Sequence, residues 1–209
     1  MSRYIGPACK LCRREGVKLF LKGERCHTPK CALQRRPYAP GMHRWRRGKR
    51  SEYSVQLREK QKVKRFYGVL EAQFRRCFAL AERKSGPTGD NLMKLFELRL
   101  DNIVTRLGFA TSRANARQLI THAHFSVNGQ HVDIPSYICR AGDVIAPRSK
   151  KEKSMLAIKR NMELTTFNNI PVWLQRDDTQ PSGSVLSEPG RGEFSVEVDT
   201  NIIIELLSK

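Results

Sequence analysis

Acidic side chains and long apolar runs are both scarce in this chain. Its 209 residues include 20 Asp and Glu against 39 Lys and Arg, which gives a formal net charge of +19. Such an excess repels itself unless a polyanion neutralises it, so nucleic acid is the first partner to consider. No stretch reaches the run of about 18 apolar residues that a membrane-spanning helix requires. This absence excludes a membrane-spanning helix.

The motifs of several enzyme classes are absent as well. The chain contains no Walker loop, dinucleotide fingerprint, nucleophile elbow or HExxH. His122, His124 and His131 lack the spacing of a metal triad, and no acidic residue is placed to orient one of them for catalysis. The first residues, MSRYIGPACK, lack the apolar core of a secretory signal, so we expect an intracellular, cytoplasmic protein.

Six cysteines are present, and four of them form two spaced pairs. In a reducing compartment such pairs are read as metal ligands before disulfides. A closed set of four thiolates suits structural zinc, and an iron–sulfur cluster on the same residues is the alternative. Nearby Lys and Arg can offset the negative charge of the thiolates. The predicted ligands are Cys9, Cys12, Cys26 and Cys31, whereas Cys77 and Cys139 are expected to be packing residues.

The positive charge is concentrated at one end of the chain. Residues 1–50 hold 15 Lys and Arg against 2 Asp and Glu. After the last clustered cysteine, LQRRPYAPGMHRWRRGKR is interrupted by Pro and Gly and predicts an extended basic arm. Trp45 within it can stack on a base while the surrounding arginines pair with phosphates. A solvated charge run is the alternative interpretation.

Helical periodicity follows the arm. Ser51 predicts the cap of a helix that ends at Gly68, with Tyr53, Leu57 and Phe66 inward and a basic face outward. A second helix should stop at Gly86 and Pro87. A third, capped by Asp90, should run through NLMKLFELRLDNIVTRLG without interruption.

The next stretch, SRANARQLITHAHFSVNGQHVDIPSYICRAGDVI, predicts a helix and a small sheet. Ser112 should cap the helix, with Ala114 inward and Arg113 and Arg117 on its exposed side. Asn128-Gly129 predicts a two-residue hairpin turn, and DVIA a further strand. A mixed-charge helix from about residue 150 follows, and FSVEVDTNIIIELL predicts strands or a strand with a closing segment.

Several stretches together are specific enough to indicate a family. They are RYIGPACKLCRREG, LKGERC, REKQKVKRFYG, FELRLDNIVTRLGFATSRANARQLI, FSVNGQHVDIPSY and GDVI. Over essentially its full length, the chain resembles the bacterial small-subunit ribosomal protein S-four family in its four-cysteine, metal-binding form. Ala123 departs from the family's usual His-Gly-His, and Leu206 or Leu207 from its usual aromatic residue.

The resemblance implies an α+β fold with three parts. Residues 1–45 would form a four-Cys metal knuckle and basic arm. Residues 46–97 would form a basic helical domain, with 199–209 as a candidate addition. Residues 98–198 would form an RNA-binding domain of two helices and a small twisted antiparallel sheet, with a C-terminal extension.

The resemblance also implies a function without catalysis. We expect a structural constituent of the small ribosomal subunit, a primary rRNA-binding protein that nucleates assembly at a 5′-domain helix junction. Its neighbours would be small-subunit proteins three and five near the mRNA entry channel, with a bearing on translational accuracy and with mRNA as a further candidate partner. No membrane or small-molecule substrate is expected.

The candidate RNA contacts are basic residues of the N-terminal half, one tryptophan, two arginines of the RNA-binding domain and one histidine. They are Arg3, Lys10, Arg13, Arg14, Lys18, Lys22, Arg35, Arg36, Arg44, Trp45, Arg46, Arg47, Lys49, Arg50, Arg58, Lys62, Arg65, Arg113, Arg117 and His124.

Two rival functions are less consistent with the sequence. Pseudouridine synthases and some tRNA synthetases carry a similar two-helix RNA-binding domain, but this chain has no credible catalytic setting outside it. A zinc-containing DNA-binding regulator would gather its basic residues on one recognition helix with a dimer spacing, whereas here they are spread over the arm and several helices.

Overall fold

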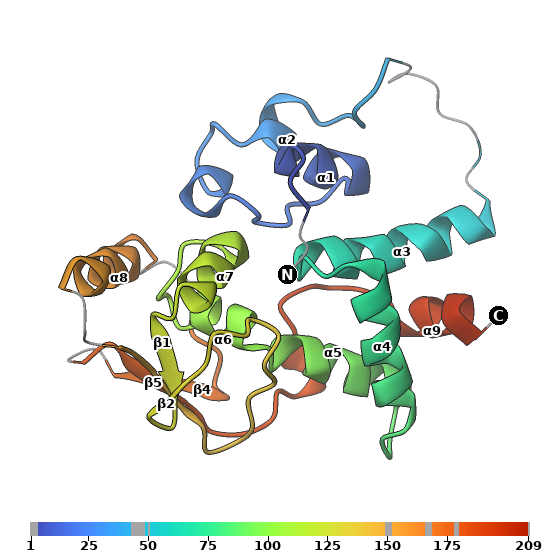
Figure 1. The fold of residues 1–209 in the computed structure, drawn as a ribbon. Helices are drawn as coiled ribbons and strands as arrows, with labels where there is room; N and C mark the ends of the chain where they lie inside the picture. The colour runs from blue at the N-terminus through green and yellow to red at the C-terminus, as the bar shows by residue number, and fades with distance from the viewer. Residues whose placement is uncertain are drawn as a thin grey trace. The chain divides into compact units, whose positions relative to one another are not determined.

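The chain divides into two compact units. Unit 1 comprises residues 1–93 and 196–209, and unit 2 comprises residues 94–195. The computed structural model (Figure 1) describes residues 4–42, 49, 51–148, 152–165, 169–177 and 180–208. None of the helices within these ranges is long and apolar enough to cross a membrane.

Unit 1 begins with three short helical elements: α1 (Ala8–Glu15), η1 (Gly23–Cys26) and α2 (Ala32–Arg35). Gly16 ends α1 in the left-handed region at φ 76°, which glycine adopts without strain. The Arg13 guanidinium lies 4.9 Å from the centre of the Tyr38 ring, and its Nε donates to the Tyr38 carbonyl at 3.0 Å. These contacts fasten the returning chain to α1. We call residues 4–42 the cysteine segment.

The remainder of unit 1 is helical, with α3 (Glu52–Phe66), α4 (Glu71–Glu82), the start of α5 (Thr88–Glu97) and α9 (Thr200–Ser208). The Ser51 hydroxyl accepts from the N–H of Ser54, as its predicted capping role requires. Phe66 is buried, whereas Tyr53 is exposed, so the prediction that Tyr53 faces inward is wrong.

Helix α9 corrects the prediction of strands near the C-terminus. It packs along α3 (Figure 1), with Ile203 buried. The run NIIIELL contains three consecutive isoleucines, and these hide its helical periodicity. The helix is recognised only from its packing on α3. Gly89 of α5 approaches α9 closely, because a Cβ at that position would lie 2.6 Å from the Thr200 side chain.

The predicted third helix is in fact two, α5 and α6 (Leu100–Arg106). The break has a tertiary cause: the N–H of Leu100 donates to the Tyr137 carbonyl at 2.8 Å, and the N–H of Cys139 donates to the Leu98 carbonyl at 2.8 Å. These backbone groups pair with a distant segment and so cannot continue the helix. The start of α5 at Thr88 also places Asp90 inside the first turn and not at the cap.

Unit 2 combines helices with a five-stranded antiparallel sheet. The helices are α6, α7 (Arg113–Thr121) and α8 (Glu152–Leu164), followed by η2 (Arg191–Glu193). The strand order is β2-β1-β3-β5-β4, and every neighbouring pair is antiparallel. The strands are β1 (Phe125–Val127), β2 (Gln130–His131), β3 (Val144–Pro147), β4 (Leu174–Asp177) and β5 (Ser182–Val185).

The local signals in unit 2 are mostly confirmed. The Ser112 hydroxyl accepts from the N–H of Asn115 at the start of α7. Asn128 and Gly129 have φ values of 50° and 77°, as the predicted hairpin turn requires. Ala114, however, is exposed, and α7 buries Ala116 and Ile120 instead. The core gathers large apolar side chains from α6, α7, the sheet and α8, including Ile103, Phe109, Ile120, Phe125, Ile158 and Trp173.

Candidate nucleic-acid interface

Four thiols lie near one another in the cysteine segment. Cys9 and Cys12 are both on α1, Cys26 ends η1, and Cys31 precedes α2 as its cap. Burial raises the pKa of Cys12 and of Cys26, and the charges of neighbouring thiols raise each further. Cys9, Cys26 and Cys31 therefore each lie within electrostatic reach of Cys12.

Backbone groups point at two of these sulfurs. The N–H of Leu19 donates to Cys12, and the N–H of Lys22 donates to Cys26 Sγ at 3.4 Å. Such bonds favour the thiolate, which is the form that binds a metal. The donor set thus has the chemistry of a structural zinc site. Among the described residues, however, no group of three or more His, Cys, Asp or Glu side chains is arranged to hold a metal ion.

The cysteine segment also presents many exposed cations. Its two carboxylates do not balance them, because Glu15 has its side chain buried and only Glu24 is exposed. Arg25 and Lys30 belong to this surface although they were not among the predicted contacts. The exposed cations are Lys10, Arg14, Lys22, Arg25, Lys30, Arg35 and Arg36, and Arg13 and Lys18 are half-buried.

The predicted outward face of α3 is only half exposed. Arg58 Nη1 contacts Glu15 Oε1 at 3.2 Å, and Arg65 Nη1 bonds to the same oxygen. Lys62 Nζ lies 2.7 Å from Glu59 Oε1, one turn back. The basic face of α3 is therefore held in ion pairs within unit 1, and does not form the open cationic surface that the spacing predicted.

The two arginines of α7 are likewise anchored and not free on an exposed face, which corrects the prediction. Arg113 Nε donates to Asn102 Oδ1 at 3.0 Å, and Arg117 Nε donates to Asp101 Oδ2 at 2.7 Å. Only 14% of the Arg117 side chain is exposed. Arg99 makes two further bonds to the buried Asp101 carboxylate, at 3.0 and 2.9 Å. Burial would raise the pKa of Asp101, but the two guanidiniums overcome it and hold that pKa below its usual range.

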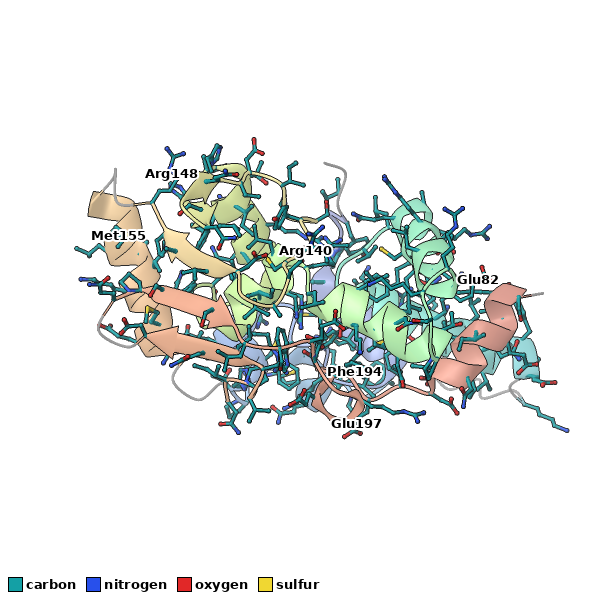
Figure 2. The ribbon with its side chains drawn as sticks, turned by 90° about the horizontal axis from the view of Figure 1, so that it is seen from below. Glu82, Arg140, Arg148, Met155, Phe194 and Glu197 are labelled. Atoms are coloured by element: carbon teal, nitrogen blue, oxygen red, sulfur yellow. The ribbon has the colours of Figure 1, made fainter. Side chains whose placement is uncertain are left out.

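His122 and His124 lie in the turn between α7 and β1, next to Arg148 just after the neighbouring strand β3. The rings of His122 and His124 are 6.2 Å apart. The N–H of Arg148, labelled in Figure 2, donates to the His124 carbonyl at 2.9 Å. The pairing of β1 with β3 brings these residues together, so Arg148 joins His124 although it lies 24 positions later. The sequence signal that could have identified Arg148 is the register of the two strands.

Part of the predicted interface lies outside the described residues. This holds for Arg3, Arg44, Trp45, Arg46, Arg47 and Arg50, whereas Lys49 is described and exposed.

Comparisons with known proteins cover the whole chain. Residues 3–97 match the model of the ribosomal protein S4/S9 N-terminal domain, and residues 98–145 match the S4 domain. The chain is 53% identical over 209 residues to the small ribosomal subunit protein uS4 of Acetivibrio thermocellus, and 54% identical over 211 residues to that of Caldicellulosiruptor bescii. It is 52% identical to uS4A of Alkaliphilus oremlandii, and in all three cases both proteins are covered in full. This chain therefore belongs to the ribosomal protein S4 family.

Proposed function

We propose that the chain is a structural, non-enzymatic component of the small ribosomal subunit that binds small-subunit rRNA in the cytoplasm. The observation that carries this proposal is the dense set of exposed cations on the cysteine segment, in a chain of net charge +19. Its relatives are named small ribosomal subunit protein uS4. Unit 2 contains the region that matches the S4 domain.

The binding mechanism is electrostatic and geometric. Exposed Lys and Arg neutralise phosphates and release counterions, so affinity should fall steeply with salt. Arginines whose guanidiniums are already held, such as Arg113 and Arg117, lose little conformational freedom when they meet a phosphate. Structured RNA is then recognised by the shape of its backbone more than by its base sequence.

The finer assignment is also a proposal. The chain would bind early in assembly at a helix junction of the 5′ domain, next to small-subunit proteins three and five, and would affect translational accuracy near the mRNA entry channel. The exposed cations of the cysteine segment support it, because a dense cationic surface can neutralise phosphates where RNA helices converge.

The test is equilibrium binding to the 5′ domain of small-subunit rRNA and to an unrelated folded RNA of equal length, over a salt series. We expect a preference for the first RNA that persists at physiological salt. Changing Arg44, Arg46 and Arg47 together to Ala should weaken binding and flatten the salt dependence. Equal affinities that fall together with salt would contradict the proposed function.

We also propose that Cys9, Cys12, Cys26 and Cys31 hold a structural zinc ion. Support comes from the four thiol donors, from the burial of three of them and from the N–H groups directed at Cys12 and Cys26. Zinc would supply the positive charge that four adjacent thiolates need, and would fasten a segment with few buried apolar side chains. An iron–sulfur cluster on the same donors is the alternative.

Metal analysis of the purified protein separates these possibilities. We expect about one zinc per chain, and none after Cys26→Ser, together with loss of ordered signals from the cysteine segment. Cys77→Ser is the matched control, because Cys77 lies in α4, outside the cysteine segment, and it should keep the metal. Iron with visible absorption would favour the cluster, and full zinc occupancy in Cys26→Ser would contradict the assigned ligands.

A further inference from the structure

A cavity of about 670 Å³ lies in unit 1 between the end of α1, the chain near Ala39 and the length of α3 from Tyr53 to Arg65. Its size falls in the range of pockets that enclose small organic groups. Figure 1 shows the two helices that contribute most of its wall. The residues that line it are Arg14, Glu15, Ala39, Tyr53, Ser54, Val55, Leu57, Arg58, Glu59, Lys62 and Arg65.

The wall of this cavity carries more positive than negative charge, with four basic and two acidic side chains. Arg58 and Arg65 share one oxygen of Glu15. The Glu15 side chain is fully buried, and its second oxygen, Oε2, has no hydrogen-bond partner among the described groups. The ion pairs therefore leave both an excess of cationic charge and an incompletely bonded carboxylate at the same place.

The arginines of the wall can accept an anion without leaving Glu15. A guanidinium has five N–H donors, and the contact with Glu15 uses one Nη1 of each arginine. Burial lowers the pKa of Arg65, and the charges of Arg58 and Arg14 lower it further, although Glu15 opposes the change. Burial likewise raises the pKa of Glu15 despite Arg65 and Arg58. An added anion would offset the repulsion among the three arginines.

An aromatic side chain, Tyr53, lines the same cavity as these cations. Tyr53 is 63% exposed and Val55 is 39% exposed, although both are large apolar side chains on a helix that buries its other face. A base that is not paired in RNA is held by stacking on such a ring, with neighbouring cations on its phosphate. Tyr53 and the arginines thus offer the two elements that a single nucleotide needs.

We propose that this cavity binds one unpaired nucleotide of the rRNA, with its base stacked on Tyr53 and its phosphate on Arg14, Lys62 and the guanidiniums of Arg58 and Arg65. The inference rests on the proposed rRNA binding and adds a specific contact to it. The ligand chemistry is an aromatic base with an attached phosphate. A free nucleotide shares this chemistry, and the experiments below separate the two sources.

The first experiment measures binding of the full chain to the 5′ domain of small-subunit rRNA over a salt series. Tyr53→Leu should weaken binding by about fivefold or more with an unchanged salt slope, since one stacked base contributes roughly 1–3 kcal/mol. Tyr53→Phe should bind like the wild type because it keeps the ring.

Lys62→Met tests the phosphate contact in the same series. It should reduce the salt slope by about 0.7–0.9, the share of one phosphate. Lys84→Met, at an exposed lysine after α4, is the control for the general loss of one charge. Equal effects of Lys62→Met and Lys84→Met, or wild-type affinity of Tyr53→Leu, would overturn the cavity assignment.

Photo-crosslinking then identifies the occupant. A benzophenone amino acid at position 53 should crosslink to one rRNA nucleotide that is not base-paired. Crosslinks spread over paired regions, or directed to another protein, would overturn the proposal. Binding of free AMP or GMP in the cavity at micromolar concentration, without competition with rRNA, would also overturn the proposal. If the proposed function itself were wrong, the wild-type protein would show no preference for the 5′ domain. That result differs from every outcome that contradicts the cavity assignment alone.

Discussion

At the scale of single residues, Ala123 occupies a backbone conformation that suits glycine. Its φ is 64°, in the left-handed region, where a Cβ costs roughly 1–2 kcal/mol. The residue joins α7 to β1 and separates His122 from His124, so the turn that positions these histidines carries the strain.

Replacement of Ala123 by glycine should therefore stabilise the protein. We expect Ala123→Gly to raise the free energy of unfolding by about 1 kcal/mol, measured by urea denaturation. Ala114→Gly is the control, because Ala114 is an exposed position inside α7 and glycine there should cost about 1 kcal/mol. A neutral or destabilising Ala123→Gly would show that the strain is absorbed elsewhere.

Glu71 gives a residue-scale prediction that depends on pH. Burial would raise the pKa of Glu71, but hydrogen bonds from Lys60 at 2.7 Å and Lys64 at 2.9 Å lower it from the ordinary value of 4.5 to about 2. Because the pKa is lower in the folded protein, the stabilisation is present above about pH 4.5 and is lost as the pH falls through about 2.

Glu71→Gln should accordingly lower the free energy of unfolding by about 1 kcal/mol at pH 7, a value reduced for solvent screening of a carboxylate that is 37% exposed. The difference from the wild type should shrink as the pH falls from about 4.5 to about 2. Glu82→Gln at the other end of α4 (Figure 2) changes the same charge at an exposed site and should leave the free energy of unfolding at pH 7 nearly unchanged. A gap that is constant with pH would argue against the ion pair.

At the scale of elements, the contact between α5 and α9 depends on the absence of one side chain. A Cβ at Gly89 would lie 2.6 Å from both Cβ and Oγ1 of Thr200. Gly89→Ala should therefore push the helices apart and destabilise unit 1 by about 1–3 kcal/mol, measured by thermal or urea unfolding. At Gly192 an added Cβ meets nothing within 4 Å, so Gly192→Ala should be neutral. Equal effects of the two substitutions would refute the close approach.

The elements also show what the sequence could predict. Serine caps at Ser51 and Ser112 and the Asn128-Gly129 turn act over two to four neighbouring residues, and all three are confirmed. The break before Leu100 depends on hydrogen bonds to a segment more than 30 positions away, which no local pattern contains. The prediction of strands near the C-terminus is wrong for the same reason, because the apolar residues of α9 are explained only by their packing on α3.

The candidate interface shows the same limit. The cysteine pairs and the basic N-terminal half were visible as patterns in neighbouring residues. The partners of the arginines were not, because Glu15 and Arg65 are 50 positions apart and Asp101 and Arg117 are 16 apart. Spacing correctly assigned Arg113 and Arg117 to one face of α7, but it could not reveal that this face lies against α6.

At the scale of the whole molecule, unit 1 is built from two separate parts of the chain and unit 2 from one. Removal of residues 196–209 should therefore uncover α3 and destabilise unit 1 by at least about 2 kcal/mol, the contribution of one buried isoleucine. Unit 2 should keep its fold. Amide NMR spectra of the truncated chain would show this as lost dispersion in α3 and α4, with the signals of α6, α7 and the sheet retained. Loss of both units together would show that they fold as one.

The position of α9 also bears on the order in which the protein is made. Helix α9 is translated after every other element, so a growing chain can complete unit 2 while α3 still lacks its partner. Until α9 has left the exit tunnel, the side of α3 that α9 covers would remain exposed. For this chain, unit 1 would therefore be completed only after the whole of unit 2 has been translated.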